Sequence, residues 1–551
     1  MNPQDLINAP TLSQVFKDSH HLDCLARSLA AFLGNQRWFA AKNEGLQSVD
    51  ILDSVEIPGD QTTFELLLAT VVTKTGSTDC YAVPIGSVAE ASTNGEEKIS
   101  DETVIATLAG DEASSAGPLR IVECSDDPEF WRAITTTLAD QTLTTRNGRV
   151  LKFSCTACSK LSTSDVFRNA DFKIHGGEQS NSAVAIGDQH FLKLFRRPRI
   201  GHNPDAEVGI FLTDRTDFKN SPQVEATIEI SGEDGNRCLA LLSEQVQGDT
   251  DAWTYTLDHL KDYWERLAKL DDRPEIPPGI GIISRKDSTL DEIQILVEQL
   301  MPSFHSEIVQ LGRRTAELHS ALSSCDDDPA FVPEPMTPET LSEQITQVRN
   351  EVQVTCKLLE NVASDYEFEA SLPDEIWARA NRKLDDMASF DVAQAGIVNI
   401  RCHGDYHLGQ VLRTEFDFVI LDFEGEPDRP FDERREKRCA MKDVAGMIRS
   451  LHYASCTTAV GMLPTPVKAI SHPGNWQRFW YENAAAAFSV AYKDTAEGQS
   501  FLPADWEVFY KLLDLFLVEK VLYELRYEIN NRPDWVQIPL AGLNAVLGLK
   551  S

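Results

Sequence analysis

The sequence lacks any apolar run close to the roughly 20 residues that a membrane-spanning helix requires. Its first residues, MNPQDLINAPTLSQVF, also lack the basic start and the apolar stretch of a signal peptide. The 11 cysteines are odd in number and have no regular spacing, so they do not indicate a disulfide framework. We therefore expect a cytoplasmic protein that does not use a membrane.

Basic residues are scarce relative to acidic ones. The 551 residues include 51 Lys and Arg against 86 Asp and Glu, which gives a net charge of −35. A field of this sign repels nucleic-acid backbones and anionic lipids, so we expect neither as a partner. A site for a phosphate-bearing ligand such as ATP then requires local cations or Mg²⁺.

The chain is too long for one compact core, and its local patterns divide it into three parts. Residues 1–132 combine predicted strands with one helix, and residues 133–248 contain short strands, tight turns and one helix. Residues 249–551 are mainly helical. We therefore predict an α+β fold in which an N-terminal α+β domain precedes a small β-rich lobe and a large helical lobe.

The individual elements follow from hydrophobic spacing and turn signals. The region from about residue 86 to 117, rich in Ser, Thr, Glu, Asp and Gly, is predicted to be a loop-bearing, solvated part of the N-terminal domain. The predicted strands cover residues 63–72, 80–85, 172–175, 183–186 and 190–195. The predicted helices cover residues 20–33, 305–322, 339–363, 374–388 and 505–530, and one more begins near Pro204.

One segment of the helical part, HGDYHLGQVLRTEFDFVILDFE at residues 403–424, combines several acidic residues with a turn. Gln410 follows Asp405 by five residues, and Asp422 follows Gln410 by twelve. The residues between Gln410 and Asp422 predict a tight β-hairpin, which returns Asp422 to the loop that contains Asp405. The alternative is an ordinary hairpin with solvated acids.

This arrangement suits phosphoryl transfer, which needs a carboxylate near the attacking hydroxyl and metal ligands near the phosphates. We therefore predict Asp405 as the catalytic base and Gln410 and Asp422 as metal ligands. The spacing is similar to that of protein kinases, with Gln410 in the place of an asparagine and Glu424 in the place of a glycine.

The β-rich part offers candidates for ATP binding. Lys193 lies in an apolar strand, where an unpaired ammonium group is costly, and Glu207 on the next helix is its predicted partner. The alternative is a lysine at a strand edge with its ammonium group in solvent. In the turn at residues 176–182, backbone amides and the hydroxyls of Ser180 and Ser182 are candidates for binding phosphates.

Further candidates follow from chain order. The segment at residues 243–248, where strands give way to helices, is the expected place for a hinge that binds adenine, through Gln245 and Val246. Glu424 and Glu426 follow Asp422 and are expected to line the acceptor side.

The two histidines beside Asp405 have two readings. A histidine in such a loop usually holds loop carbonyls by hydrogen bonds, and this reading is favoured for His403 and His407. Direct contact with substrate or metal is the alternative, and His407 is the residue we consider for contact with substrate.

These residues, together with longer strings, resemble bacterial maltokinase. The strings spread over most of the chain; among them are GNQRWFAAKN (34–43), EQSNSAVAIGDQHFLKLFRR (178–197), HGDYHLGQVLRT (403–414) and KDVAGMIRSLHYA (442–454). The resemblance implies a protein-kinase-like, aminoglycoside-phosphotransferase-like bilobal fold behind an N-terminal cap domain. It also implies MgATP-dependent phosphorylation of maltose at the anomeric hydroxyl, giving maltose 1-phosphate for α-glucan (glycogen) synthesis from trehalose.

The resemblance assigns the same roles by matching position. Asp405 resembles the catalytic base, Gln410 and Asp422 the magnesium ligands, and Lys193 with Glu207 the ATP-anchoring pair. The chain departs from a typical member in additional acidic sequence around residues 320–345. It also has Cys-Ala-Met at residues 439–441, where members often have Ser-Pro-Leu.

Several alternatives stay open at this point. Related kinases with the same cap accept glucosamine, and either Glu424 or Glu426 suits an aminosugar as well as maltose. The same pattern occurs fused behind trehalose synthase, so association with that enzyme, or a non-catalytic kinase fold that acts as its partner, is a second possibility. An aminoglycoside- or choline-type phosphotransferase is a third.

Overall fold

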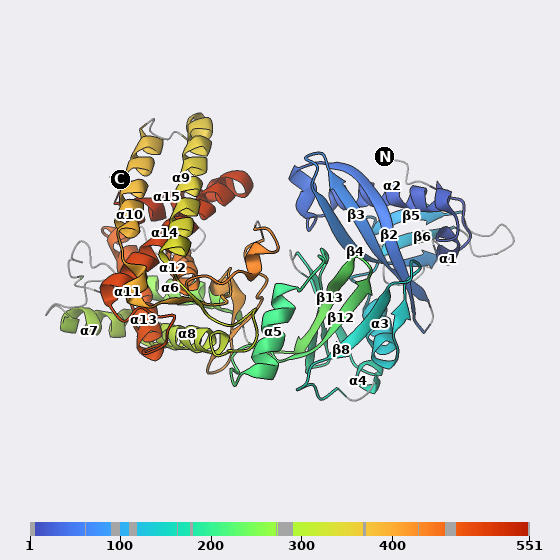
Figure 1. Ribbon diagram of the computed structural model, residues 1–551, viewed down its shortest axis with the longest axis horizontal. Coiled ribbons are helices and arrows are strands. Elements are labelled where there is room, and N and C mark those ends of the chain that lie inside the picture. The colour runs from blue at the N-terminus through green and yellow to red at the C-terminus, as the bar shows by residue number, and fades with distance from the viewer. Residues whose placement is uncertain are drawn as a thin grey trace. The chain divides into compact units, whose positions relative to one another are not determined.

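The computed structural model describes residues 6–548 except 61, 90–99, 110–117, 162–163, 177–179, 249, 271–272, 274–289, 367–370, 428 and 458–469. The chain forms two compact units, Met1–Arg215 with Pro222–Gln247, and Thr216–Ser221 with Gly248–Ser551. The first unit contains two β-sheets, and the second is largely helical (Figure 1). This mixture of helices and sheets confirms the predicted α+β class.

The first sheet of the first unit has six strands in the order β1-β5-β6-β4-β3-β2, antiparallel except for the β1–β5 pair. The elements of this part are β1 (Leu6–Ile7), α1 (Leu12–Val15), α2 (Ser19–Asn35), β2 (Leu46–Pro58), β3 (Thr63–Thr73), β4 (Thr78–Ala89), β5 (Val104–Leu108), β6 (Leu119–Glu123) and α3 (Pro128–Asp140). Helix α2 and strands β3 and β4 contain the predicted helix at 20–33 and the predicted strands at 63–72 and 80–85. In the loop-bearing region predicted at about 86–117, β4 continues to Ala89, and β5 is a short strand that the sequence analysis did not predict.

Both faces of this sheet are covered. Helix α2 packs Leu29 against one face, where Leu67 points. Helix α3 packs Trp131 against the opposite face, where Leu66 and Leu68 point. Because successive side chains of a strand point to opposite faces, β3 needs apolar residues at consecutive positions, which explains its unbroken apolar run.

The second sheet has seven strands in the order β7-β8-β12-β13-β11-β10-β9, and every neighbouring pair is antiparallel. Its elements are β7 (Leu143–Thr144), β8 (Val150–Cys155), α4 (Asp165–Arg168), β9 (Phe172–His175), β10 (Ser182–Ile186), β11 (His190–Leu194), α5 (Pro204–Arg215), β12 (Val224–Gly232) and β13 (Gly235–Glu244). The strands predicted at 172–175, 183–186 and 190–195 and the helix near Pro204 are confirmed.

Helix α3 connects the cores of the two sheets. Its residues Phe130 and Trp131 belong to one buried hydrophobic cluster together with Leu66 of the first sheet and Leu192 of the second. The position predicted as the boundary between the first two domains, at residues 132 and 133, therefore lies in the middle of a helix that both sheets pack against.

The second unit consists of helices around two small sheets, β14-β17-β18 and β15-β16. Its strands are β14 (Thr250–Asp251), β15 (Glu334–Pro335), β16 (Val398–Asn399), β17 (Val411–Arg413) and β18 (Phe418–Ile420). Its helices are α6 (Ala252–Ala268), α7 (Leu290–Leu300), α8 (Pro302–Leu322), α9 (Pro338–Tyr366), α10 (Leu372–Ala388), α11 (Val392–Ala395), α12 (Met441–Cys456), α13 (Pro473–Thr495), α14 (Trp506–Asn531) and α15 (Gln537–Leu547). Helices α8, α9, α10 and α14 correspond to the four helices predicted in this part.

Helices α8 and α13 of this unit pack closely against each other. At Gly312 of α8, an added Cβ would lie 2.4 Å from the carbonyl oxygen of Phe488 in α13, so only glycine fits there. The rings of Phe304 and Trp480 stack between the same two helices.

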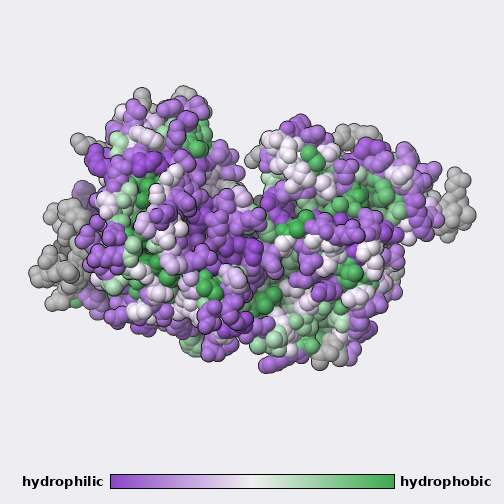
Figure 2. Space-filling model, in the orientation of Figure 1, coloured by the Kyte–Doolittle hydropathy of each residue, from purple (hydrophilic) through white to green (hydrophobic). Residues whose placement is uncertain are grey.

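Among the described residues, no helix is long and apolar enough to cross a bilayer. Hydrophilic residues dominate the visible face of each unit, as the acidic composition leads one to expect (Figure 2).

Candidate active site

The loop between β16 and β17 is held by one buried carboxylate on α12. The backbone amides of His403 and Gly404 donate hydrogen bonds to the two oxygens of Asp443, at 2.8 and 2.9 Å. His319 Nε2 lies 3.0 Å from the same carboxylate. Burial favours the neutral form of Asp443, but the contact with His319 and the loop amides outweigh it and hold its pKa below the ordinary value. Asp443 is therefore ionised, and its carboxylate fixes the position of the loop.

Two glycines allow this loop to lie close to its neighbours. Gly404 has φ of +89°, a conformation that glycine adopts without strain. An added Cβ at Gly446 of α12 would lie 2.5 Å from the carbonyl oxygen of Tyr406. The Tyr406 hydroxyl lies 2.9 Å from Thr315 Oγ1 of α8, so the loop is packed against two helices around Asp405.

The two histidines of the loop make different contacts. His403 is buried, and its Nε2 lies 2.8 Å from the carbonyl oxygen of Leu421, so it holds a loop carbonyl, as the favoured reading of this residue predicts. His407 Nδ1 accepts a hydrogen bond from the amide of Gly409, and its Nε2 lies 3.9 Å from Asp405 Oδ2. Contact of His407 with substrate stays a prediction.

The predicted hairpin between Gln410 and Asp422 is confirmed. Strands β17 and β18 pair antiparallel, and the amide of Thr414 donates to the carbonyl of Asp417 at the turn. At the open end, Gln410 Nε2 donates to Asp422 Oδ2 at 2.9 Å. The amide oxygen of Gln410 and the other oxygen of Asp422 are thus brought to the same end of the hairpin.

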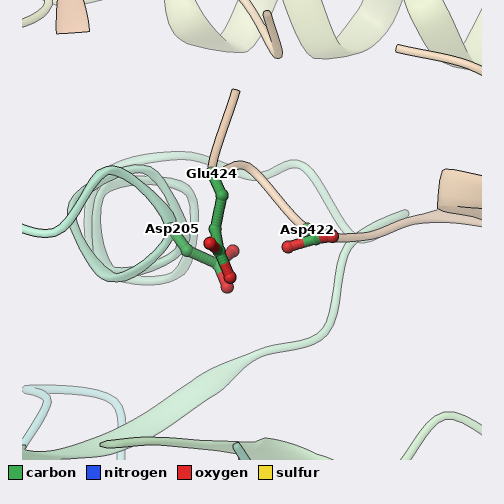
Figure 3. A group of neighbouring side chains, drawn as sticks. All are labelled: Asp205, Asp422 and Glu424. Carbon is green, nitrogen blue, oxygen red and sulfur yellow. The ribbon is translucent and has the colours of Figure 1, made fainter. Parts of the chain in front are cut away.

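Asp422 and Glu424 bring two carboxylates close together. Each offers an oxygen within 4.8 Å of the other, and Figure 3 shows both side chains on the stretch of chain that follows β18. Asp422 has φ of +64°, which is uncommon for a residue other than glycine and tends to occur at functional sites. Oxygen ligands of this kind are the ones that Mg²⁺ prefers.

A network of opposite charges surrounds Asp405. Lys520 Nζ of α14 lies 3.1 Å from Asp405 Oδ1 and 2.9 Å from Glu426 Oε1. We call the whole network the Asp405 cluster; its members are Asp405, Glu426, Arg429, Lys442, Glu519 and Lys520. Three acids and three bases make it formally neutral.

Lys520 and Glu426 stay charged in this cluster although little of either side chain is exposed. Burial lowers the pKa of Lys520, but the carboxylates of Glu426 and Asp405 outweigh it and hold the pKa well above its ordinary value. Burial likewise raises the pKa of Glu426, but Lys442, Lys520 and Arg429 hold it well below the ordinary range. The carboxylate at Glu426 is therefore already neutralised by cations of the chain.

In the first unit, Lys193 on β11 has a carboxylate partner that the sequence analysis did not identify. Lys193 Nζ lies 2.9 Å from Oδ2 of Asp205, which lies in the first turn of α5 with Glu207 two positions further along (Figure 3 labels Asp205). Asp205 therefore joins the candidates for the ATP-anchoring group, and pairing of Lys193 with Glu207 stays a prediction.

The other predicted ATP-binding residues lie in the same sheet or directly beside its strands. Ser182 is the first residue of β10 and not part of a turn, and its buried Oγ has no hydrogen-bond partner among the described residues. Ser180 is exposed, and residues 177–179 of the predicted turn lie outside the described residues. Gln245 and Val246 follow β13, and the amide of Gln245 donates to the carbonyl of Gln189. The chain passes into the second unit two residues later, where a hinge segment is expected.

Comparison with known proteins adds independent information. Residues 32–116 match the family described as the maltokinase N-terminal cap domain. The glucosamine kinase of Streptacidiphilus jiangxiensis is 27% identical over 376 residues, which are 67% of this chain and 72% of the relative. A glucosamine kinase of Mycolicibacterium smegmatis is 30% identical over 159 residues, 28% of this chain and 36% of the relative.

The fold is also found among solved structures. A glucosamine kinase solved with glucosamine, ADP and inorganic phosphate has a TM-score of 0.56 at 18% identity, covering 94% of this chain and 99% of that chain. The chain is thus a phosphotransferase with the kinase fold that the sequence predicts. Its residues 32–116 are similar to the maltokinase N-terminal cap domain, and its fold is that of kinase-fold phosphotransferases.

Proposed function

We propose that the chain is an ATP-dependent sugar kinase that transfers the γ-phosphoryl group to the anomeric hydroxyl of maltose. The observation that carries this choice is the position of Lys520 between Asp405 and Glu426. With every acid of the Asp405 cluster paired to a cation, a neutral sugar can approach Asp405 without a compensating charge, whereas an ammonium group would be repelled by Lys520. Maltose 1-phosphate for α-glucan synthesis is the proposed product.

In the proposed reaction Asp405 accepts the proton of the acceptor hydroxyl. The hydroxyl oxygen forms a bond to the γ-phosphorus while the bond from that phosphorus to the bridging β–γ oxygen breaks, and ADP leaves. Lys520 holds Oδ1 of Asp405 at 3.1 Å, so Oδ2 is the oxygen that faces the acceptor. His407, Glu424 and Glu426 are the proposed contacts with the sugar hydroxyls.

The oxygen atoms of Gln410, Asp422 and Glu424 suit Mg²⁺ in chemistry and in spacing. When bound, Mg²⁺ would neutralise the phosphate charges that the acidic chain otherwise repels. In the first unit, Lys193 would pair with phosphate oxygens while Asp205 and Glu207 position it. Ser180 and Ser182 would bind phosphates, and Gln245 and Val246 would bind adenine through the backbone.

The metal assignment leads to a prediction for Asp422→Asn. Asparagine tolerates the left-handed backbone of this position, so the fold should survive while one anionic ligand is lost. We expect the Mg²⁺ concentration for half-maximal activity to rise by about tenfold or more, since one lost charge-assisted contact is worth roughly 1.5–3 kcal/mol. Rates measured across a Mg²⁺ titration test this, with Glu415→Gln in the exposed hairpin turn as the control. An unchanged Mg²⁺ dependence in Asp422→Asn would remove the ligand role.

A second prediction concerns Lys193→Met, which keeps the length of the side chain and removes its charge. We expect kcat/KM for ATP to fall by about 10²-fold, because a desolvated charge pair with a phosphate is worth roughly 3 kcal/mol. Lys173→Met on β9 is the matched control, since Lys173 is exposed on the same sheet. If both variants use ATP equally well, Lys193 does not anchor the nucleotide.

Glucosamine is the second candidate acceptor, because the relatives described above are glucosamine kinases. The deciding experiment measures ATP consumption with maltose, glucose, glucosamine, trehalose and choline, and then locates the phosphate on O1 or O6 of the product. We expect the highest kcat/KM with maltose and phosphate on O1. A higher value with glucosamine would replace maltose by the aminosugar. Phosphate on O6 would overturn the proposed position of transfer.

A non-catalytic role, for example as a partner of trehalose synthase, is the remaining candidate. Retention of Asp405, Gln410, Asp422 and Lys193 together speaks against it, because a fold without activity needs none of these groups. Failure of all five acceptors to stimulate ATP consumption would favour this role. Association with trehalose synthase is compatible with both readings and would be tested by co-purification of the two proteins.

A further inference from the structure

The second unit contains a groove that the proposed reaction does not use. Its volume is about 720 Å³, which lies within the range of small-molecule binding sites. Three segments line it: residues 329–347, residues 399–401 and residues 432–438. The first of these overlaps the acidic sequence around residues 320–345.

Two buried amide side chains in the wall of the groove have unused acceptors. Gln344 is 6% exposed and Asn399 is 5% exposed. Gln344 Oε1 and Asn399 Oδ1 have no hydrogen-bond partner among the described residues. Buried polar atoms are normally paired, and an unpaired one calls for an explanation such as a ligand. The ligand that would satisfy these two oxygens must present hydrogen-bond donors.

The charged groups of the groove largely satisfy one another. Arg401 Nη1 donates to the carbonyl of Arg435 at 2.9 Å, and Arg438 pairs with Glu436. Lys437 donates to the carbonyl of Pro329 at 2.7 Å and also pairs with Glu334. The described lining contains five acids and four bases, so an ionic ligand finds little net charge. A neutral ligand rich in hydroxyl groups fits best.

Apolar ligands are disfavoured by the same wall. Among the described residues that line the groove, the aliphatic ones are Pro329 and Ala330, and none is aromatic. The described lining thus combines buried acceptors, balanced charges and little apolar surface. Such a lining suits a ligand that is held by hydrogen bonds from hydroxyl groups, which a neutral carbohydrate supplies.

A single arginine connects the groove to the Asp405 cluster. Arg429 Nε lies 2.6 Å from Glu426 in the cluster, and its Nη1 lies 3.8 Å from Glu433, which lines the groove. We infer that the groove binds further sugar units of an oligosaccharide acceptor whose reacting end lies at Asp405. This inference rests on the proposed sugar-kinase function and extends its substrate class from a disaccharide to longer neutral glucans.

The test is direct binding of maltotriose to the full chain without ATP, measured by calorimetry. Gln344→Leu and Asn399→Leu each remove one unpaired oxygen at similar volume. We expect the dissociation constant for maltotriose to rise about three- to tenfold in each variant, the value of one hydrogen bond. Loss of that oxygen should not lower the thermal unfolding midpoint, because the oxygen has no hydrogen-bond partner among the described residues. Gln294→Leu on the exposed face of α7 is the matched control and should leave binding unchanged.

Three outcomes would overturn the inference. Equal maltotriose binding by the wild type and both groove variants would remove the groove as the site. A lower unfolding midpoint in both variants would show that the two amides serve the fold and not a ligand. Tight binding of inorganic phosphate that either substitution abolishes would make the groove an anion site. Because the assay uses no ATP, it can succeed even if maltose phosphorylation fails, and the reverse also holds.

Discussion

Replacing Asp405 by alanine is expected to lower kcat for phosphoryl transfer by about 10²–10⁴-fold, the range typical of a lost general base. The folded state should survive, because Lys520 keeps its second partner, Glu426, at 2.9 Å. The loop itself is held by Asp443 through the amides of His403 and Gly404, and the substitution does not touch these bonds. Initial rates with saturating ATP and acceptor, together with thermal unfolding, measure both effects.

The matched control for this experiment is Glu415→Ala. Glu415 is an exposed carboxylate in the turn of the β17–β18 hairpin, so its loss changes the net charge of the chain by the same amount as the loss of Asp405. We expect this control to retain the wild-type rate. Near wild-type turnover in Asp405→Ala would show that another group accepts the proton, and the assigned mechanism would then be wrong.

The local geometry of the site could be predicted because it depends on neighbouring residues. A hairpin with a short turn must return Asp422 to the level of Gln410, and the bond of 2.9 Å between these side chains follows from that constraint. The same holds for Lys193, whose apolar strand requires a carboxylate partner nearby. Proximity alone could not decide between Asp205 and Glu207, since both lie in the first turn of α5.

The basic half of the Asp405 cluster could not be predicted from local patterns. Lys520 lies 115 residues after Asp405, and no spacing rule connects positions so far apart. One signal was nevertheless present: Glu519 and Lys520 interrupt the apolar sequence LDLFLVEKVLYEL in α14. Charged residues within an apolar helix must be paired when the helix is buried, so this interruption marks a buried ion pair even where its partners are unknown.

The common core of the two sheets in the first unit could not be predicted from local patterns either. Strands of both sheets could be recognised in the sequence. The core that the two sheets share around Phe130 and Trp131 depends on packing between residues far apart in the chain. Strand β5, between two segments of polar composition, was missed because its five residues are too few for a periodic signal.

Replacing Lys520 by methionine is expected to change which acceptor the enzyme prefers. The substitution leaves the Asp405 cluster with three acids and two bases, so one negative charge becomes uncompensated beside the acceptor. Lys520 also positions Asp405 through its contact of 3.1 Å with Oδ1, and a small misplacement of a catalytic group can lower the rate by about 10²-fold. We therefore expect kcat/KM for maltose to fall by about 10²-fold. An aminosugar supplies the missing positive charge, so kcat/KM for glucosamine should fall less or rise.

The ratio of the two kcat/KM values is the quantity to measure, because a general loss of stability lowers both and leaves their ratio unchanged. Lys511→Met on the same helix is the matched control, since Lys511 pairs only with Glu507 one turn away among the described contacts. Lys520→Arg, which restores the charge, should restore the preference for maltose. If the ratio in Lys520→Met equals that of the wild type, charge neutrality at Asp405 does not select the acceptor. The preference would then have to come from the shape of the sugar site, and the case for maltose over glucosamine would lose its electrostatic basis.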